Sequence, residues 1–544
     1  MTRAHLRQVA LLYLIAAIIS GCGKKPAVLP EQPLIFDVVY PKDVGTSGEK
    51  LPDPYVDSTF ALGSVSPYDS RVFVNGVEAE MWDNGAFLAW FPMNEDTVYR
   101  FLAVSPAGDS VLYEHPFRVA LPAPDTLRLA YLQSEQQKYL EEILSHLPAR
   151  LVVSDSHAVV KTAPRRGYWF FPPAGTVVWA DSFNSSYYRI SLDDNLQGWI
   201  EDRFIERDST SMEPPGALVH SLSVAADESA AYLKIPLRER LPFTISEFPA
   251  GNSLLLELFG VTAHMDQIKF ASPDSLIRDI RWRKISDRTL QLEIVTGISQ
   301  LWGYDAYFEG NALIIELRRP PKIERSVLKN RVIAVDPGHG GDNLGAIGPT
   351  RLAEKDANLA IALQLQELLE KKGATVILTR QKDTAIGLYE RIDYSSSAGA
   401  EMLLSIHNNA IADGSNPFLL NGSSVYYYHA QSRDLAAAIH SRLLEASGLQ
   451  DHGLYYKNLA LARPTNMLAV LIECAFMIHP DEELLLRDKR FIKHLAQGIV
   501  KGLEDFLKQE RNSSRGSRHH FYYDVPSTIQ KPIWHPLTNQ RQDE

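Results

Sequence analysis

The stretch Val332–Gly341 reads Val-Ile-Ala-Val-Asp-Pro-Gly-His-Gly-Gly and decides the fold class of the C-terminal third of the chain. Its first four residues form an apolar run of the kind that makes a buried strand. The glycines on both sides of His339 free the backbone to turn sharply and expose the imidazole. A buried strand that ends in such a polar turn predicts an α/β domain whose functional groups gather where strands end.

The sequence that follows alternates between strand and helix patterns. Further strands are expected at Thr375–Thr379, Met402–Ile406, Ser424–Tyr428 and Ala469–Glu473, and helices at Asp356–Lys372, Tyr389–Ser397, Ser432–Ala446 and Phe491–Leu507. This alternation predicts an α/β domain over residues 331–508 with a mostly parallel sheet. The tail, residues 509–544, is polar and punctuated by prolines, so we expect it to be disordered.

Four polar residues lie at the ends of these elements: His339, Glu354, His407 and Glu473. Two imidazoles and one carboxylate form a ligand set of hydrolytic zinc sites, and a second carboxylate held off the metal can act as general base and acid. Composition alone does not identify such a set, because a single histidine is more often structural than a ligand.

Four ordered motifs add specificity to this pattern. They are Asp-Pro-Gly-His-Gly-Gly at 336–341, Glu-Lys followed by Asn at 354–358, Ser-Ile-His-Asn-Asn at 405–409, and Leu-Ile-Glu at 471–473. Through them the segment resembles the zinc-dependent N-acetylmuramoyl-L-alanine amidases, which have a phosphorylase/hydrolase-like α/β fold. The resemblance implies that His339, Glu354 and His407 bind one Zn²⁺ and that Glu473 is the catalytic carboxylate.

The resemblance also implies a reaction, hydrolysis of the amide between the lactyl group of muramic acid and L-alanine in peptidoglycan. Two departures from the family pattern concern the wall of the site: Leu468 stands where proline is usual, and residues 474–479 differ. Two alternatives stay open, a non-catalytic peptidoglycan-binding scaffold with an amidase-like fold and a zinc peptidase that cuts a related amide. Some members of the family carry a long insertion after the Ser-Ile-His strand that folds as a helix and blocks the zinc site. The stretch 410–424 is too short for such a helix. An envelope activator protein is a candidate partner.

Residues 1–22 predict a secretory signal with a lipid attachment site. Arg3 and Arg7 precede an apolar run of signal-peptide length, and Ile19–Cys22 looks like a lipobox. The expectation is a lipid-anchored envelope protein, facing the periplasm from the outer membrane, in which Cys22 is lipidated and residues 23–33 form a tether. The alternative is an ordinary cleaved signal with a coincidental cysteine.

Between tether and C-terminal domain the pattern is mostly β. Residues 34–120 resemble an immunoglobulin-like domain, with Asn75-Gly76 as a hairpin turn. Residues 121–149 are expected to be a helical connector, and residues 150–210, which end in a Gly198-Trp199 pair, resemble an SH3-like domain. Residues 217–320 form a third β-rich segment, weakly similar to the targeting domains of envelope amidases.

The composition excludes two classes of protein, those that bind nucleic acid through a basic surface and those held together by disulfides. The 544 residues carry 55 Lys+Arg and 66 Asp+Glu, a net charge of −11, which gives no basic footprint for nucleic acid. The 2 cysteines exclude a disulfide framework, and Cys474 is expected to be a buried core thiol on the strand face opposite Glu473. Asn358, one helical turn after Glu354, is expected to orient that ligand. Arg380 is expected to pair with a carboxylate, and neither Arg380 nor Asp336 is assigned to the site.

Overall fold

The computed structural model describes residues 33–41, 57–92, 98–116, 137–184, 186–248, 253–271, 274, 276–412 and 414–516. The chain divides into two compact units. The first consists of Met1–Pro148, Ser182–Ser186 and Asn330–Gly502, and the second of Ala149–Asp181, Tyr187–Lys329 and Leu503–Glu544. Among the helices in these described ranges, none has the length and apolar character needed to cross a membrane. The predicted signal with Cys22 lies outside the described residues, as do residues 121–136 of the connector; residues 137–145 are helical.

Two four-stranded antiparallel sheets form the first β region. Their strands are β1 (Ile35–Tyr40), β2 (Ser58–Ser66), β3 (Arg71–Val74), β4 (Val77–Glu78), β5 (Glu80–Met81), β6 (Ala86–Pro92), β7 (Val98–Val104) and β8 (Ser110–Pro116), in the orders β1-β2-β6-β5 and β4-β3-β7-β8. Residues from both sheets, such as Phe87 and Phe101, share one buried core. The hairpin prediction is confirmed, because Asn75 and Gly76 join β3 to β4 with φ of 48° and 82°, the positive values that a type I′ turn requires.

A seven-stranded sheet forms the second β region. Its strands are β9 (Ala149–Val153), β10 (Val160–Lys161), β11 (Tyr168–Phe170), β12 (Val177–Asn184), β13 (Tyr187–Asp193), β14 (Leu196–Glu201) and β15 (Ile205–Arg207), with the 3-10 turn η1 (Asp202–Phe204) before β15. Gly198 lies in β14, where an added Cβ would come within 2.4 Å of Val160 Cγ1. This position therefore tolerates no side chain without a shift of the neighbouring strand.

Two further sheets share the core of the third β region. Their strands are β16 (Ala217–Ala226), β17 (Ala230–Ile235), β18 (Phe243–Glu247), β19 (Ser253–Phe259), β20 (Val261–Phe270), β21 (Ile277–Ser286), β22 (Thr289–Thr296), β23 (Tyr304–Glu309) and β24 (Ala312–Arg318). The sheet orders are β20-β16-β17-β24-β23 and β18-β19-β22-β21. Alternate apolar residues from both sheets, among them Leu233, Leu256 and Leu292, are fully buried, as expected for two sheets packed face to face.

The C-terminal region is the predicted α/β domain, built on a six-stranded sheet with the order β26-β25-β27-β30-β28-β29. The strands are β25 (Val332–Pro337), β26 (Thr375–Leu378), β27 (Met402–Asn409), β28 (Ser423–Tyr427), β29 (Asp451–Tyr456) and β30 (Leu468–Phe476). Only the β28–β30 pairing is antiparallel in this described sheet, so the prediction of a mostly parallel sheet is confirmed. Strand β29 is not among the strands predicted from the sequence.

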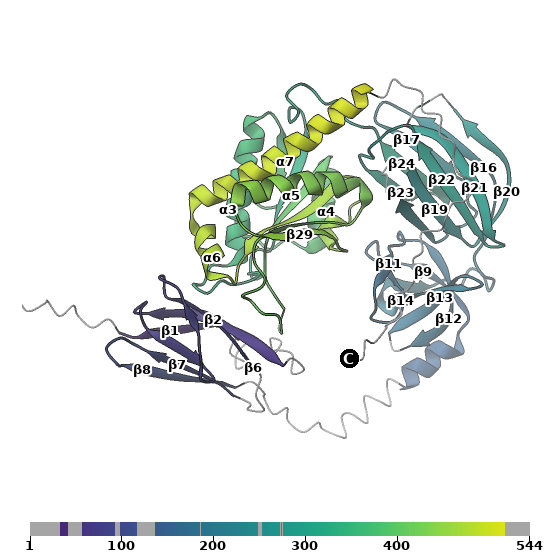
Figure 1. Cartoon of the computed structure of the whole chain (residues 1–544). Helices are drawn as coiled ribbons and strands as arrows, with labels where there is room; N and C mark the ends of the chain where they lie inside the picture. The colour runs from purple at the N-terminus through teal and green to yellow at the C-terminus, as the bar shows by residue number, and fades with distance from the viewer. Residues whose placement is uncertain are drawn as a thin grey trace, which may run out of the picture. The chain divides into compact units, whose positions relative to one another are not determined.

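The helices of this domain lie near their predicted positions except for α6, which was not predicted from the sequence. They are α3 (Glu354–Lys371), α4 (Leu388–Ser397), α5 (Arg433–Ser447), α6 (Pro480–Arg487) and α7 (Lys489–Gly516), with the 3-10 turns η2 (Ala430–Ser432) and η3 (Ala460–Ala462). Figure 1 shows α5 and α7 side by side. Their close approach depends on Gly502, where an added Cβ would lie 2.5 Å from Ile439 Cα.

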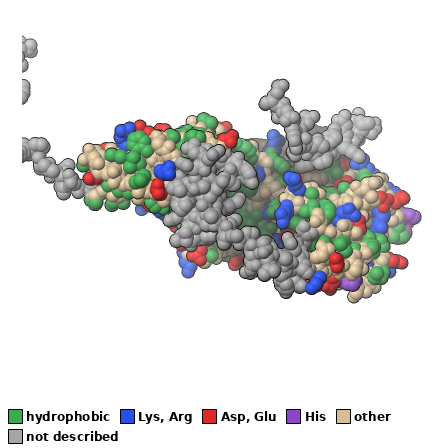
Figure 2. Space-filling view, turned by 90° about the horizontal axis from the view of Figure 1, so that it is seen from below, with side chains coloured by type: hydrophobic (Ala, Val, Ile, Leu, Met, Phe, Trp, Pro, Cys, Tyr) green, Lys and Arg blue, Asp and Glu red, His purple; other side chains and the backbone are tan. Residues whose placement is uncertain are grey.

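The prediction of disorder from residue 509 is wrong for residues 509–516, because α7 continues to Gly516. Glu510 is buried, and Arg511 donates hydrogen bonds to the carbonyl oxygens of Glu324 and Arg325. These tertiary contacts extend the helix beyond its apolar stripe. Residues 517–544 lie outside the described range. On the face shown in Figure 2, acidic and basic side chains are interspersed wherever described residues are visible.

Candidate metal centre and active site

The loop after β25 carries the first candidate ligand, His339. Its backbone φ is 62°, and Gly340 and Gly341 follow at 135° and 59°, so the sharp turn expected from the glycines is present. Gly338 is required for space, since an added Cβ would lie 2.2 Å from His407 Cε1. The loop thus brings the two imidazoles together, with their ring centroids 5.0 Å apart.

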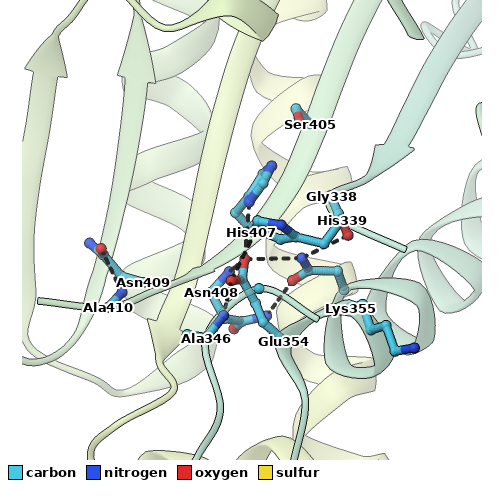
Figure 3. A network of polar contacts seen from close by, with 12 residues as sticks. Gly338, His339, Ala346, Glu354, Lys355, Ser405, His407, Asn408, Asn409 and Ala410 are labelled. Atoms are coloured by element: carbon cyan, nitrogen blue, oxygen red, sulfur yellow. Dashed lines mark hydrogen bonds and ion pairs between the residues drawn. The ribbon is translucent and has the colours of Figure 1, made fainter. Parts of the chain in front are cut away.

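Glu354 and His407 complete the group. Glu354 is the first residue of α3, and His407 lies near the end of β27. One carboxylate oxygen of Glu354 lies 3.1 Å from His339 Nε2 and the other 3.0 Å from His407 Nδ1. Figure 3 shows the three side chains pointing toward one another. Among the residues that the structure describes, this trio is the group identified as able to hold a metal ion, with its ligand atoms all within 4.8 Å. We call it the ligand cluster.

Neighbouring amides orient two members of the ligand cluster, His339 and Glu354. His339 Nδ1 lies 3.0 Å from Asn343 Oδ1, which favours a proton on Nδ1 and leaves Nε2 facing Glu354. Asn358 Nδ2 donates to Glu354 Oε1 at 3.1 Å, as the prediction for this helical neighbour requires. The backbone N–H of Asn408 also donates to Glu354 Oε1, and the side-chain Nδ2 of Asn408 donates to Asn358 Oδ1. These hydrogen bonds fix the orientation of the side-chain atoms of His339 and Glu354 that could bind a metal ion; Figure 3 shows the network around them.

The electrostatics of the ligand cluster favour charged forms in the metal-free chain. Burial opposes ionisation of Glu354, but hydrogen bonds from His339 and His407 outweigh it and hold the pKa of Glu354 well below its usual range. Burial likewise opposes protonation of His407, yet Glu354 and Glu473 raise the pKa of His407 overall. A carboxylate that stays ionised between two imidazoles suits a divalent cation.

Glu473 lies on β30 directly beside His407 in the parallel register. Paired residues on neighbouring strands point to the same face of a sheet, so Glu473 faces the ligand cluster. Its Oε2 atom is buried and makes no hydrogen bond to any described residue. Burial raises the pKa of Glu473 to about 7, with a smaller contribution from Glu354, while the charge of His407 acts in the opposite direction. Such a group can take and return a proton near neutral pH.

The next residue, Cys474, is a fully buried free thiol. Alternation along β30 directs it to the face opposite Glu473, so the prediction of a core thiol is confirmed. The other histidines of the domain do not join the ligand cluster. His429 Nε2 lies 2.9 Å from the Arg463 carbonyl oxygen, and His440 lies 2.9 Å from Asp451. His479 packs edge-on against Trp82.

A second buried group lies behind the His339 loop, and we call its residues, Asp336, Arg380 and Arg391, the arginine cluster. Asp336 accepts hydrogen bonds of 2.6–2.7 Å from Thr379, Arg391 and Ser405. Arg391 also donates to the carbonyl oxygens of Pro337 and His339. The arginine cluster therefore fixes the backbone of Pro337 and His339, and with it the position from which the His339 imidazole extends.

Arg380 acts on the same backbone. It donates to the carbonyl oxygens of Pro337, Gly338 and Lys355 at 2.8–3.0 Å. Within the described residues it forms no salt bridge, so the suggestion of a carboxylate partner is wrong. Burial and the charge of Arg391 lower its pKa. Backbone carbonyls take the place of the carboxylate because Asp336 is already occupied by Arg391.

Several supporting residues escaped the sequence analysis. Asn408 belongs to the Ser-Ile-His-Asn-Asn motif and Asn343 lies two residues after the first motif, so their positions could have suggested a supporting role. Two carboxylates at the start of α6 had no such signal. Glu482 accepts from the backbone N–H groups of Gly422 and Phe476, and Glu483 from Thr350 and Leu352. They tie together loops that are far apart in the sequence.

The fold and the site together define a class, an α/β domain with a hydrolytic ligand set at the carboxyl ends of its parallel strands. Comparison with known proteins gives the family. Residues 333–505 match the N-acetylmuramoyl-L-alanine amidase family, and this part of the chain is an amidase domain of that family.

Individual proteins are similar to this chain over about a third of its length. The probable cell wall amidase LytH of Staphylococcus aureus is 38% identical over 186 residues, which cover 34% of this chain and 61% of that protein. The chain therefore spans less than two thirds of the length of this curated relative. Two solved structures are the catalytic domain of the amidase CwlV from Bacillus (Paenibacillus) polymyxa var. colistinus and the CwlD amidase from Clostridioides difficile in complex with the GerS lipoprotein. The first is 35% identical, with 33% of this chain and 98% of that chain covered and a TM-score of 0.31. The second is 29% identical, with 33% and 100% covered and a TM-score of 0.31.

Proposed function

We propose that the protein is a zinc-dependent N-acetylmuramoyl-L-alanine amidase that hydrolyses the lactyl–L-alanine amide of peptidoglycan. One observation carries the proposal. In an amidase-family domain, the ligand cluster and the unpartnered carboxylate of Glu473 are side by side on neighbouring strands and face the same way. A scaffold protein has no need of a buried carboxylate whose oxygen lacks a hydrogen bond, since such a group costs stability.

The ligand cluster fits the proposed metal. His339, Glu354 and His407 would hold one Zn²⁺, because two imidazoles and one carboxylate are a ligand set of catalytic zinc and leave a coordination position free. Asn343 and Asn358 support the fit by orienting His339 and Glu354. When bound, zinc supplies Lewis acidity, which polarises the scissile carbonyl group and makes a water molecule more acidic.

Glu473 would supply the proton transfers. Its carboxylate takes a proton from the attacking water and returns it to the amide nitrogen as the bond between the lactyl carbonyl and L-alanine breaks. The products are a free lactyl carboxylate on the glycan and a stem peptide with a new amino end. The pKa of about 7 for Glu473 in the metal-free chain supports both directions of transfer near neutral pH.

The remaining parts of the chain would set where this reaction occurs. We propose that Cys22 carries a lipid anchor in an envelope membrane, with the protein in the periplasm at the outer membrane. The β regions, proposed to be immunoglobulin-like, SH3-like and related to amidase targeting domains, would hold the active domain at a distance from the anchor. A protein activator is a further proposal, to which the CwlD amidase solved with the GerS lipoprotein lends support.

The test uses full-length protein in detergent on purified peptidoglycan, with no additive, with a chelator, and with zinc restored after chelation. Mass spectrometry identifies the released fragments. We expect free stem peptides with L-alanine amino ends, lost with the chelator and restored by zinc. Glu473→Gln should lower the rate by about 10²–10⁴-fold, the usual contribution of a general base.

The matched control is Glu445→Gln, which makes the same change on an exposed carboxylate of α5 and should keep the wild-type rate. Three outcomes contradict the proposal. Binding of peptidoglycan without fragments, even with envelope extract added, indicates a scaffold. Cuts within the stem peptide indicate a peptidase. Unchanged turnover in Glu473→Gln removes that residue from the mechanism.

A further inference from the structure

The catalytic face of the sheet continues past Glu473 onto the two outer strands, β28 and β29. Ser424 of β28 pairs with Glu473, and Tyr426 pairs with Leu471, two residues earlier on β30. Tyr455 of β29 is in turn the register partner of Tyr426. Because paired residues share a face, Tyr426 and Tyr455 lie on the same face as Glu473 and His407.

Two tyrosine rings form a flat surface at this position. The rings of Tyr426 and Tyr455 are stacked, with centroids 5.1 Å apart and planes inclined by 19°. Tyr426 is almost buried, whereas Tyr455 is 38% exposed, so the pair presents one ring to solvent. The Tyr455 hydroxyl donates to the His452 carbonyl oxygen at 2.6 Å, which fixes the orientation of that ring.

Lys457 adds a positive charge to this surface. It follows Tyr455 by two residues and is exposed, and its Nζ atom lies 5.5 Å from the Tyr426 ring centroid, within the range of a cation–π interaction. No carboxylate among the described residues forms an ion pair with it. Its charge nevertheless acts on Glu473, where it lowers the pKa against the larger effect of burial. Lys457 is therefore a cation beside the catalytic carboxylate that has no anionic partner of its own.

The direction of the reaction decides which part of the substrate meets this surface. In the sheet order, the strand of His407 is followed by the strand of Glu473 and then by β28 and β29. The scissile carbonyl group belongs at the ligand cluster, and the leaving nitrogen belongs at Glu473, which returns the proton. The peptide attached to that nitrogen consequently extends toward β28 and β29, and the glycan extends the other way.

We propose that Tyr426, Tyr455 and Lys457 form a subsite for the stem peptide and that Lys457 selects peptides with free carboxylates. The proposal rests on the proposed amidase function. A stem peptide is acidic, and the carboxylate of Glu473, which is not a proposed zinc ligand, would repel it. An unpaired lysine on the peptide side offsets this repulsion, and the stacked rings offer a flat apolar surface to the peptide backbone.

The experiment compares two muramoyl peptides that are identical except that the stem carboxylates are free in one and carboxamides in the other. For zinc-loaded full-length protein, kcat/KM is measured on both, and the ratio of the two values reports the selection. We expect the ratio to fall by about fivefold in Lys457→Gln, the effect of one partly exposed ion pair. Lys457→Arg, which retains the positive charge, should keep a ratio close to that of the wild-type protein.

The matched control is Lys371→Gln, which removes the same charge at the far end of α3 and should leave the ratio unchanged. Tyr455→Ser should raise KM for both substrates and preserve the ratio. An unchanged ratio in Lys457→Gln, or an equal fall in Lys371→Gln, overturns the subsite.

A binding measurement separates this proposal from the amidase function. Free stem peptide with intact carboxylates is titrated into the wild-type and Lys457→Gln proteins, and the Kd values are compared. A Kd about fivefold higher in Lys457→Gln supports the subsite, even if the wild-type protein cleaves neither muramoyl peptide and the amidase proposal fails. Equal Kd values overturn the subsite and leave the amidase proposal to its own test.

Discussion

The two buried polar groups of the amidase domain lie on opposite sides of one loop, yet they differ in how completely they are satisfied. In the arginine cluster, Asp336 accepts three hydrogen bonds, one of them from Arg391, and Arg391 and Arg380 also donate to backbone carbonyls. In the active site, Glu473 keeps a buried oxygen without a partner, and Glu354 bridges two imidazoles. The carboxylate of the arginine cluster has its hydrogen bonds, whereas Glu473 has an oxygen that could still bind a ligand.

Because the two groups differ in hydrogen bonding, mutations in the arginine cluster and mutations in the active site should have different effects. A satisfied buried ion pair holds structure, and removal of one partner leaves the other charge buried without compensation. An unsatisfied group contributes little to stability in the free protein but gains interactions when a cation or substrate arrives. Mutations in the arginine cluster should thus affect stability first, and mutations around the ligand cluster should affect binding and turnover first.

The largest effect should come from Arg391→Leu. It leaves Asp336 buried beside Thr379 and Ser405 but without its cation, which should lower the opening free energy of the domain by about 3–5 kcal/mol. Hydrogen exchange of the β25 and β27 amides, followed by mass spectrometry, measures this. The control Arg490→Leu removes an arginine whose side chain is 88% exposed, and it should leave the exchange of these amides nearly unchanged. Equal effects of the two variants would contradict the distinction.

Zinc should stabilise the same amides by a smaller amount. At a free zinc concentration about 100 times its Kd, a ligand that binds only the folded domain contributes about 2.7 kcal/mol. Exchange of the β25 and β27 amides should therefore slow when zinc is added to chelated protein. His407→Ala, which removes one ligand, should abolish the response. If zinc slowed exchange equally in that variant, it would be binding elsewhere.

Asn358→Leu should have a moderate effect confined to metal binding. The change removes the hydrogen bonds to Glu354 Oε1 and to the Gly338 carbonyl oxygen, and loss of such a supporting contact costs about 10–100-fold in metal affinity. Competition with a chromogenic chelator gives the affinity without recourse to activity. Gln366→Leu, on a half-buried position of the same helix away from the ligand cluster, serves as control. An unchanged zinc affinity in Asn358→Leu would show that Glu354 needs no orienting amide.

The smallest effect is expected at Cys474, on the closed face of the strand that carries Glu473. Burial raises the pKa of its thiol well above the usual value, so the reactive thiolate is scarce at pH 8. Iodoacetamide should leave the Cys474 peptide unlabelled in folded protein and label it fully in urea. Ser441→Cys places a thiol on an exposed turn of α5 and should react in both. Rapid native labelling of Cys474 would mean that this face opens.

The sequence predicted the elements of the amidase domain better than their contacts. Apolar periodicity and Gly448 placed a helix at 432–446, and the structure has α5 at Arg433–Ser447 with Gly448 at φ 67°. It missed β29, because Asp451–Tyr456 includes a glycine and lacks the β-branched residues that indicate a strand. Propensity also could not predict the last turns of α7, which depend on tertiary contacts of Arg511.

The four candidate site residues were identified through motif resemblance, which carries no information on what supports them. Arg391 lies 55 positions after Asp336, and no local pattern joins them. Tyr426 and Tyr455 meet only because β28 and β29 pair in one parallel register. Pairings of this kind depend on strand order, and strand order is decided by the packing of the whole domain.

The position of β30 links completion of the domain to its chemistry. Strands β25 to β29 all precede it in the chain, yet β30 inserts between β27 and β28. Until Leu468–Phe476 has been synthesised and paired, the sheet has a gap at its centre and the site lacks Glu473. A chain that lacks this strand, or in which the strand has not yet paired, is consequently without Glu473 beside the ligand cluster. The strand that completes the sheet also completes the candidate site, so the site can form only after β30 has been synthesised and paired.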